Sequence, residues 1–279
     1  MVKIITDSAS LYTAEEANAK GFRAIPLCIS IDDWDKRDLQ IDMDQFYNKI
    51  AEESVPKSSQ PPIGEVLEVY EEFLTDEIIN ITIADGLSGT YQTACAAKQM
   101  SEHVDNITVF NSRTLCGPLQ YMVKQANDMA QAGASKEEIL NWLEVHRETA
   151  HSFLIPQDLE FLKRGGRLTP VAAKIGSLLK LKPTLKQTDD GKRLDKFAIK
   201  RTLSATVESI VRNLQHASIH LDESYCVYVS HARVEKDASK VVELLKKTFP
   251  KIQVTVLELS PAFVTQGGPG CIAIQYIKK

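Results

Sequence analysis

The sequence lacks most features that mark a secreted, membrane-spanning or nucleic-acid-binding protein. Its 279 residues include five cysteines, an odd number without any Cys-x-x-Cys pair, which argues against a disulfide framework and favours the reducing cytoplasm. No run of about 18 apolar residues occurs, so no membrane-spanning helix is expected. With 33 Lys and Arg against 37 Asp and Glu, the net charge of −4 creates no basic field that would attract nucleic acid.

Motifs for nucleotide and metal chemistry are also missing. The sequence contains no phosphate-binding Gly-x-x-x-x-Gly-Lys-[Ser/Thr] loop, no His-Glu-x-x-His helix and no cluster of His and Cys. The turn Gly267-Gly268-Pro269-Gly270 does not have the Gly-x-Gly-x-x-Gly spacing of a dinucleotide-binding fold. We therefore expect neither a cofactor nor a metal, and the remaining signals favour binding.

The first half of the chain, residues 1–150, predicts an α/β domain with a mainly parallel sheet. Short β-branched runs alternate with longer amphipathic stretches, which is typical of βα units. Strands are predicted at Val2–Ile5, Ile78–Ile83 and Ile107–Phe110. Helices are predicted at Ala14–Lys20, Asp44–Glu52, Gly64–Leu74, Thr90–Ser101 and Gly117–Ala132, and a capping box formed by Ser135 and Glu138 begins another.

Residues 151–279 predict a second α/β domain, with a mixed or antiparallel sheet and helices. The turn Asp189-Asp190-Gly191 separates two extended segments, Thr184–Gln187 and Arg193–Lys200, which indicates a hairpin. A Gly165-Gly166 break and a helix start at Thr169-Pro170 precede it. Further helices are predicted near Thr202–His216 and Lys236–Thr248, and further strands at Tyr225–Ser230 and Gln253–Leu259.

Ser88 is the first candidate binding residue. It lies in the turn Gly86-Leu87-Ser88-Gly89-Thr90, between a predicted strand and a predicted helix. Unpaired N–H groups at a helix N-terminus favour a carboxylate or phosphate, and the ends of parallel strands are where α/β folds bind ligands. A serine that only caps its helix explains the same pattern equally well.

The same turn also allows an enzymatic interpretation. Its sequence differs from the Gly-x-Ser-x-Gly nucleophile elbow because Thr90 stands in place of the final glycine. A serine hydrolase or acyltransferase also needs a histidine base with an acidic partner. Of the six histidines, only His231 follows a predicted strand directly, and no spacing links it to Ser88.

Three other segments carry polar groups in restrained settings. Ser58 and Ser59 lie in Lys57-Ser58-Ser59-Gln60-Pro61-Pro62, where the prolines stiffen the backbone. Arg167 follows the paired glycines and could turn inward as an anion-binding fork, although basic residues at a helix end often only compensate the helix dipole. A local basic cluster, which could equally be a solvated face, comprises Lys192, Arg193, Lys196, Lys200 and Arg201.

Taken together, these segments resemble the DegV family of bacterial fatty-acid-binding proteins, the carrier subunits of the fatty acid kinase system. The resemblance runs essentially end to end, and the order and spacing of its markers are more specific than any one of them. The markers are Ile5-Thr6-Asp7-Ser8, Ser58-Ser59-Gln60-Pro61, Leu87-Ser88-Gly89-Thr90-Tyr91, Leu162-Lys163-Arg164-Gly165-Gly166-Arg167 and Gly268-Pro269-Gly270.

The resemblance implies a two-domain α/β protein, itself not an enzyme, with one long-chain fatty acid in an apolar tunnel near the domain junction. It further implies a separate ATP-dependent kinase that phosphorylates the bound carboxyl group, so that the acyl phosphate enters phospholipid synthesis. Each buried methylene contributes about 0.8 kcal/mol, while the carboxylate needs hydrogen bonds to offset its desolvation. The ligand-binding residues implied are Ser58 or Ser59, Ser88, Gly89, Thr90, Arg167 and Gln266.

Two positions depart from the family pattern. Gln266 stands where the family commonly has His before the Gly-Pro-Gly turn, and an amide can donate a hydrogen bond but cannot carry a positive charge. Ser58 replaces a threonine and keeps its hydroxyl. The hypotheses left open are a carrier, a serine-dependent lipid hydrolase or acyltransferase using Ser88, and a lipid-sensing regulator. Acyl length, saturation and oligomeric state are not encoded in any motif.

Overall fold

The chain divides into two compact units, which the computed structural model describes over residues 1–175 and 181–279. The first unit comprises Met1–Glu148 together with Ser260–Thr265, and the second comprises Thr149–Leu259 together with Gln266–Lys279. The short segment Ser260–Thr265 therefore belongs to the first unit although both flanking stretches of chain belong to the second.

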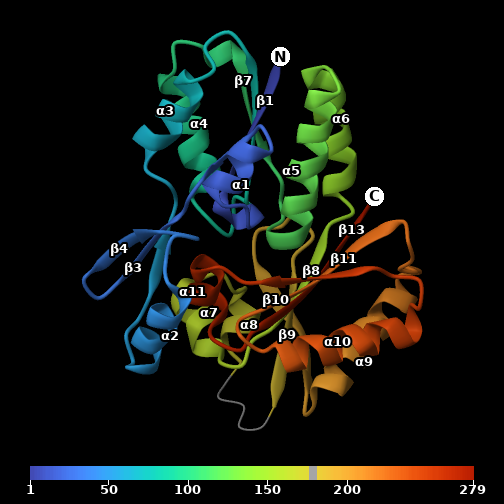
Figure 1. Ribbon diagram of the computed structural model, residues 1–279. Helices are drawn as coiled ribbons and strands as arrows, with labels where there is room; N and C mark the ends of the chain where they lie inside the picture. Colours follow the sequence, from blue (N-terminus) through green and yellow to red (C-terminus); the bar gives the residue numbers. More distant parts are fainter. Residues whose placement is uncertain (176–180) are drawn as a thin grey trace. The chain divides into compact units, whose positions relative to one another are not determined.

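A four-stranded parallel sheet forms the centre of the first unit. Its order is β2-β1-β6-β7, and its strands are β1 (Val2–Asp7), β2 (Arg23–Ile25), β6 (Glu77–Thr82) and β7 (Ile107–Asn111). Figure 1 shows helices α3 and α4 on one side of this sheet and helices α5 and α6 on the other. Isoleucines dominate β1 and β6 because strands covered on both faces need apolar side chains on both. The predicted parallel sheet is confirmed.

The helices of the first unit begin at the signals that the sequence carries. Thr13 caps α1 through a capping box with Glu16, and Ser135 caps α6 through a capping box with Glu138. The helices are α1 (Ala14–Ala19), α2 (Met43–Ala51), α3 (Ile63–Glu71), α4 (Thr90–Met100), α5 (Cys116–Gln131) and α6 (Lys136–Arg147), with 3-10 turns at Ser8–Ser10 and Val104–Asn106.

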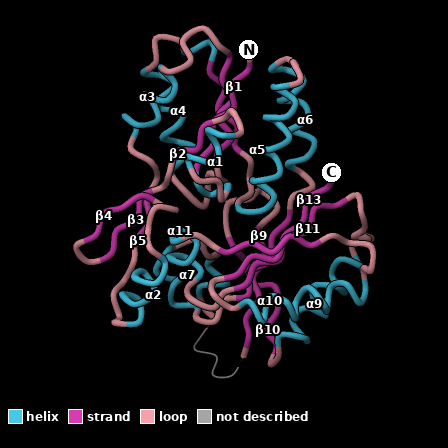
Figure 2. The backbone as a smooth tube through the Cα atoms, viewed as in Figure 1, coloured by secondary structure: helices cyan, strands magenta, loops and turns pink. Residues whose placement is uncertain are grey.

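A second, smaller sheet in the first unit carries the serine segment. It is antiparallel, in the order β4-β3-β5, with β3 (Cys28–Ile31), β4 (Trp34–Arg37) and β5 (Lys57–Ser59). Figure 2 shows these three short strands together. The sequence did not predict this sheet, because its strands are only three or four residues long, too short to show a periodic pattern.

The second unit contains a six-stranded mixed sheet in the order β10-β9-β8-β13-β11-β12, in which only β11 and β12 pair in parallel. This confirms the predicted mixed sheet and the β9–β10 hairpin. Its strands are β8 (His151–Ile155), β9 (Lys182–Gln187), β10 (Leu194–Lys200), β11 (Tyr225–His231), β12 (Val254–Glu258) and β13 (Ile272–Lys278).

The two faces of this sheet pack against different helices. Phe153 and Ile155 of β8 belong to the main core with α9 (Leu203–His216) and α10 (Glu235–Thr248). Leu154, between them, packs in a separate cluster with residues of α7 (Leu159–Gly165) and α8 (Pro170–Ala173). This alternation follows from the two-residue period of a strand. The chain also forms α11 (Pro261–Gly267), which begins in the first unit.

Candidate carboxylate-binding site

Ser88 lies where β6 gives way to α4, in a turn whose base is Ala84. The carbonyl of Ala84 accepts hydrogen bonds from the N–H groups of Leu87 (3.0 Å) and Ser88 (3.2 Å). The Ser88 hydroxyl lies 2.8 Å from the Thr90 hydroxyl and 3.3 Å from the Thr90 nitrogen. Gly89, the N-cap residue of α4, has no side chain with which to cap the helix. Two adjacent hydroxyls therefore stand at the N-terminus of α4.

The Ser88 hydroxyl makes its hydrogen bonds with Thr90. Among the described residues, no imidazole hydrogen-bonds to Ser88. His146 stacks on Trp142 with ring centroids 3.9 Å apart, and His231 is the last residue of β11. At the start of α4, the Ser88 hydroxyl can donate a hydrogen bond to an anion.

The two serines of β5 face opposite sides of the small sheet. Ser59 pairs with Cys28 of β3, and Ser58 pairs with Ile29. Because successive side chains of a strand alternate, the half-buried Ser58 points away from the exposed Ser59. Gln60 reaches α4: a Cβ added to Gly89 would stand 3.0 Å from its Oε1 atom. The segment after β5 therefore contacts the residue next to Ser88.

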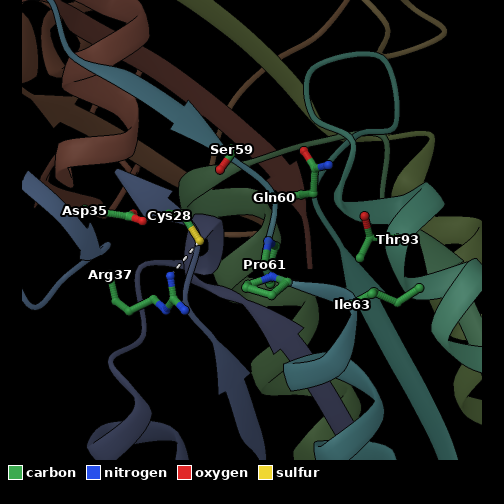
Figure 3. A pocket seen from close by; sticks show the side chains of 9 residues that line it. Cys28, Asp35, Arg37, Ser59, Gln60, Pro61, Ile63 and Thr93 are labelled. Atoms are coloured by element: carbon green, nitrogen blue, oxygen red, sulfur yellow. Dashed lines mark hydrogen bonds between the residues drawn. The ribbon is translucent and has the colours of Figure 1, made fainter. Parts of the chain in front are cut away.

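Ser59 lines an open groove of about 470 Å³ on the first unit. Figure 3 shows Cys28 and Arg37 on one side of this groove and Gln60 and Thr93 on the other. Arg37 donates a hydrogen bond of 2.9 Å to the Cys28 thiol and pairs with Glu65, so its charge is already neutralised by its neighbours. Burial raises the pKa of Cys28, which keeps the thiol protonated.

Arg167 and Gln266, both in the second unit, converge on Gly165. The Arg167 guanidinium donates to the carbonyl oxygen of Gly165, and a Cβ on Gly165 would collide with Oε1 of Gln266. Only a glycine therefore allows Gln266 to lie where it does. Arg167 is half-buried, and desolvation, followed by the nearby charge of Arg193, lowers the pKa of its guanidinium.

A second close approach fixes the turn that follows Gln266. A Cβ on Gly268, whose φ is +79°, would stand 2.8 Å from the ring of Phe161 in α7. Phe161 and Gly165 lie one helical turn apart on α7. Gly268 approaches Phe161, and Gln266, two residues before it, approaches Gly165. Gly165 and Gly268 thus allow Gln266 and the turn that follows it to pack closely against α7.

Comparison with known proteins agrees with this fold. The family model that matches is DegV, described as an uncharacterised protein family, and it covers residues 1–279. A DegV domain-containing protein of Clostridium acetobutylicum is 33% identical over 280 residues, covering 99% of this chain and 97% of the relative. The chain belongs to the DegV family.

Two solved DegV structures are similar over nearly their whole length. The DegV family protein from Thermus thermophilus, described by its fatty acid binding, has a TM-score of 0.89 at 27% identity, with 100% of this chain and 99% of that chain covered. DegV from Bacillus subtilis, described as a fatty acid binding protein, has a TM-score of 0.84 at 31% identity, with the same coverage. The family resemblance predicted from the sequence is confirmed.

The described residues also show the state of the cysteines, the character of the helices and the grouping of possible metal ligands. The five cysteines all lie in the described residues and form no disulfide there. Among the described helices, none combines the length and hydropathy needed to cross a bilayer. In the same residues, no group of three or more His, Cys, Asp or Glu side chains could hold a metal ion.

Sequence reasoning missed two buried carboxylates of the first unit, Asp7 and Asp38. Asp7 ends β1 and accepts hydrogen bonds from the N–H groups of Ile83 (2.8 Å) and Ala9 (2.9 Å). Asp38 is 1% exposed. Burial raises the pKa of each to about 6. An aspartate directly after a buried strand was the available signal for Asp7; nothing near Asp38 in the sequence indicates its burial.

Proposed function

We propose that this protein binds one long-chain fatty acid through hydrogen bonds to its carboxylate and performs no chemistry on it. The observation that carries the proposal is the hydroxyl pair of Ser88 and Thr90 at the start of α4, whose N-cap residue Gly89 offers no side-chain hydrogen bond. Hydroxyl and helix N–H groups stabilise an anion at that position. The fatty acid binding described for the Thermus and Bacillus relatives supports the choice of ligand.

A loss of carboxylate binding in a Ser88→Ala variant tests this proposal. A hydrogen bond to a charged group contributes about 1.5–3 kcal/mol, so the affinity for a fatty acid should fall by about 10- to 100-fold. The affinity for a fatty alcohol of equal length should change much less. Stoichiometric labelling of Ser88 by a serine-reactive phosphonate, or ester turnover that disappears in the variant, would instead establish a hydrolase.

Within β5, we infer that Ser58 is the serine that serves the carboxylate. Ser58 is half-buried, whereas Ser59 is exposed and lines the groove beside Cys28. Ser58→Ala should therefore weaken fatty acid binding, and Ser59→Ala, as the matched control, should leave it nearly unchanged. Equal effects of the two substitutions would refute this assignment.

In the second unit, we propose that Arg167 and Gln266 face an anionic group, either a carboxylate or the acyl phosphate that a separate kinase makes from it. Gln266 can donate through its amide, and Arg167 keeps its charge at neutral pH even with a lowered pKa. Replacing Arg167 with Lys preserves a positive charge but removes the planar fork, so a larger loss for Arg167→Ala than for Arg167→Lys would indicate that charge matters more than geometry.

We further propose that a separate ATP-dependent kinase receives the bound fatty acid and that the acyl phosphate feeds phospholipid synthesis. The basic cluster on β10 and the residues directly flanking it is the proposed docking surface, and Lys192, Arg193, Lys196 and Arg201 are exposed. Exchanging Lys200 and Arg201 for glutamate should weaken acyl-phosphate formation while fatty acid binding persists. Unchanged acyl-phosphate formation would remove the docking role from this surface.

A further inference from the structure

Asp7 links the carboxyl ends of β1 and β6, the two central strands of the parallel sheet. The chain runs from β1 to β2 on one side and then to β6 and β7 on the other, so the strand order changes direction between β1 and β6. Such a switch point is where α/β folds bind ligands. The Oδ2 atom of Asp7 accepts from the N–H of Ile83, the first residue after β6, at 2.8 Å, and its Oδ1 atom accepts from the N–H of Ala9 at 2.9 Å.

The segment that Asp7 holds is the base of the Ser88 turn. Ala84, which follows Ile83, accepts a hydrogen bond of 3.2 Å from the N–H of Ser88. Its own N–H donates to the carbonyl oxygen of Thr114 at 3.0 Å. The base of the turn is therefore tied to β1 through Asp7 and to the segment after β7 through Thr114.

The two bonds of Asp7 require a carboxylate. Asp7 is 2% exposed, and burial raises the pKa of its carboxyl group to about 6, so the charged form is costly at this position. Capping the 3-10 turn Ser8–Ser10 through the N–H of Ala9 needs one acceptor, which serine or asparagine supplies as well as aspartate does. The second donor, from Ile83, needs a second, diverging acceptor oxygen, and a carboxylate provides it.

We propose that Asp7 is a positioning residue: its bond to the N–H of Ile83 fixes the base of the Ser88 turn and so places the Ser88 hydroxyl for recognition of the ligand's carboxyl group. All of these residues belong to the first unit. This inference rests on the proposed fatty acid binding. It predicts that changes at Asp7 alter selectivity for the head group, and that they act through Ser88.

The test compares affinities for a fatty acid and a fatty alcohol of equal length, measured by isothermal titration calorimetry on the delipidated full chain. Asp7→Asn leaves one acceptor oxygen for two N–H donors, and Asp7→Ser can cap Ala9 but is too short to reach Ile83 as well. The ratio of acid to alcohol affinity should fall by about 3- to 10-fold in both variants. This loss is smaller than in Ser88→Ala, because the hydroxyl is displaced rather than removed.

A double-mutant cycle shows whether Asp7 acts through Ser88. When Asp7→Asn is added to Ser88→Ala, the ratio should fall no further, because the hydroxyl that Asp7 places is already gone. Urea unfolding of each variant establishes that it is folded, and Asp7→Ser replaces Asp7→Asn in the cycle if the asparagine variant does not fold.

Asp38→Asn is the matched control. Asp38 is an equally buried aspartate of the same unit, 1% exposed, but its donors lie outside the Ser88 turn. They are the hydroxyls of Ser8 and Ser260 and the N–H of Ala262. The effect of Asp38→Asn on the ratio, whatever its size, should add to that of Ser88→Ala.

Four results would overturn the inference while leaving fatty acid binding intact. They are an unchanged ratio in both Asp7 variants, an equal loss of acid and alcohol affinity in both, full additivity of Asp7→Asn with Ser88→Ala, and an effect of Asp38→Asn that also disappears in the Ser88→Ala background. Failure of the wild-type protein to bind the fatty acid, or an unchanged ratio in Ser88→Ala alone, would instead overturn the proposed function.

Discussion

The two buried carboxyl groups of the first unit should make the protein more stable, not less, as the pH falls from 7 to 5. Burial raises the pKa of Asp7 and of Asp38 from 3.8 to about 6. Over this range the folded chain takes up protons that the unfolded chain does not yet bind, and the free energy of unfolding rises wherever the folded state binds more protons. The gain begins near pH 7 and is complete near pH 4, where the unfolded carboxyl groups also become protonated.

The change in the free energy of unfolding can be worked out for one carboxyl group that binds one proton. Each pH unit over which the folded state holds one extra proton adds about 1.4 kcal/mol, and half-titration at pH 6 gives about 1.4 kcal/mol between pH 7 and 5. Asp7 and Asp38 each contribute such a term, so the two carboxyl groups together add about 3 kcal/mol between pH 7 and 5.

Urea unfolding, followed by the fluorescence of Trp34 and Trp142, measures this effect, since both tryptophans lie in the first unit. The control is Asp38→Asn, which removes one buried carboxyl group and leaves every other titratable side chain in place. The stability difference between wild type and variant should change by about 1 kcal/mol in favour of wild type between pH 7 and 5. Parallel pH profiles for the two proteins would refute the reasoning.

Three further substitutions test the packing around Gly165 and Ile210 and the role of Gln266. Gly165→Ala should force the end of the flexible Gln266 side chain to move, because the new methyl group would stand 2.0 Å from its Oε1 atom, and should change the free energy of unfolding by less than about 1 kcal/mol in urea; Gly64→Ala, with open space around it, is the control. Gln266→His should make fatty acid affinity rise as the pH falls through about 6.5, while fatty alcohol affinity stays constant in calorimetry. Ile210→Ala should cost about 2–5 kcal/mol in the same unfolding assay, because Ile210 is completely buried in the core of the second unit; a smaller loss would show that the core relaxes around the cavity.

Sequence patterns predicted the long, periodic elements well. The apolar runs of β1, β6 and β7, the capped helices α1 and α6, and the Asp-Gly hairpin of β9 and β10 all appear where expected. These elements carry their own signals, since a strand buried on both faces must be apolar and a helix end must satisfy its N–H groups. The strand–turn–helix setting of Ser88 was predictable for the same reason.

The parts that were not predictable depend on contacts between distant residues. The small β3–β4–β5 sheet has strands too short for a periodic signal, and only its pairing shows that Ser58 and Ser59 face opposite sides. Nothing in Ser260–Thr265 indicates that this segment belongs with the first unit. The burial of Asp38 likewise depends on donors that the chain supplies more than two hundred residues later.

The measurement that tests the central claim most directly is extraction of the purified protein with organic solvent, followed by mass spectrometry of the lipid released. The account predicts one unmodified long-chain fatty acid per chain, with less retained by Ser88→Ala and an amount close to wild type retained by Ser59→Ala. Native mass spectrometry before extraction should show the matching mass increment. A protein that carries no fatty acid and does not take one up after delipidation, or one that carries an acyl group covalently bound to Ser88, would contradict the account.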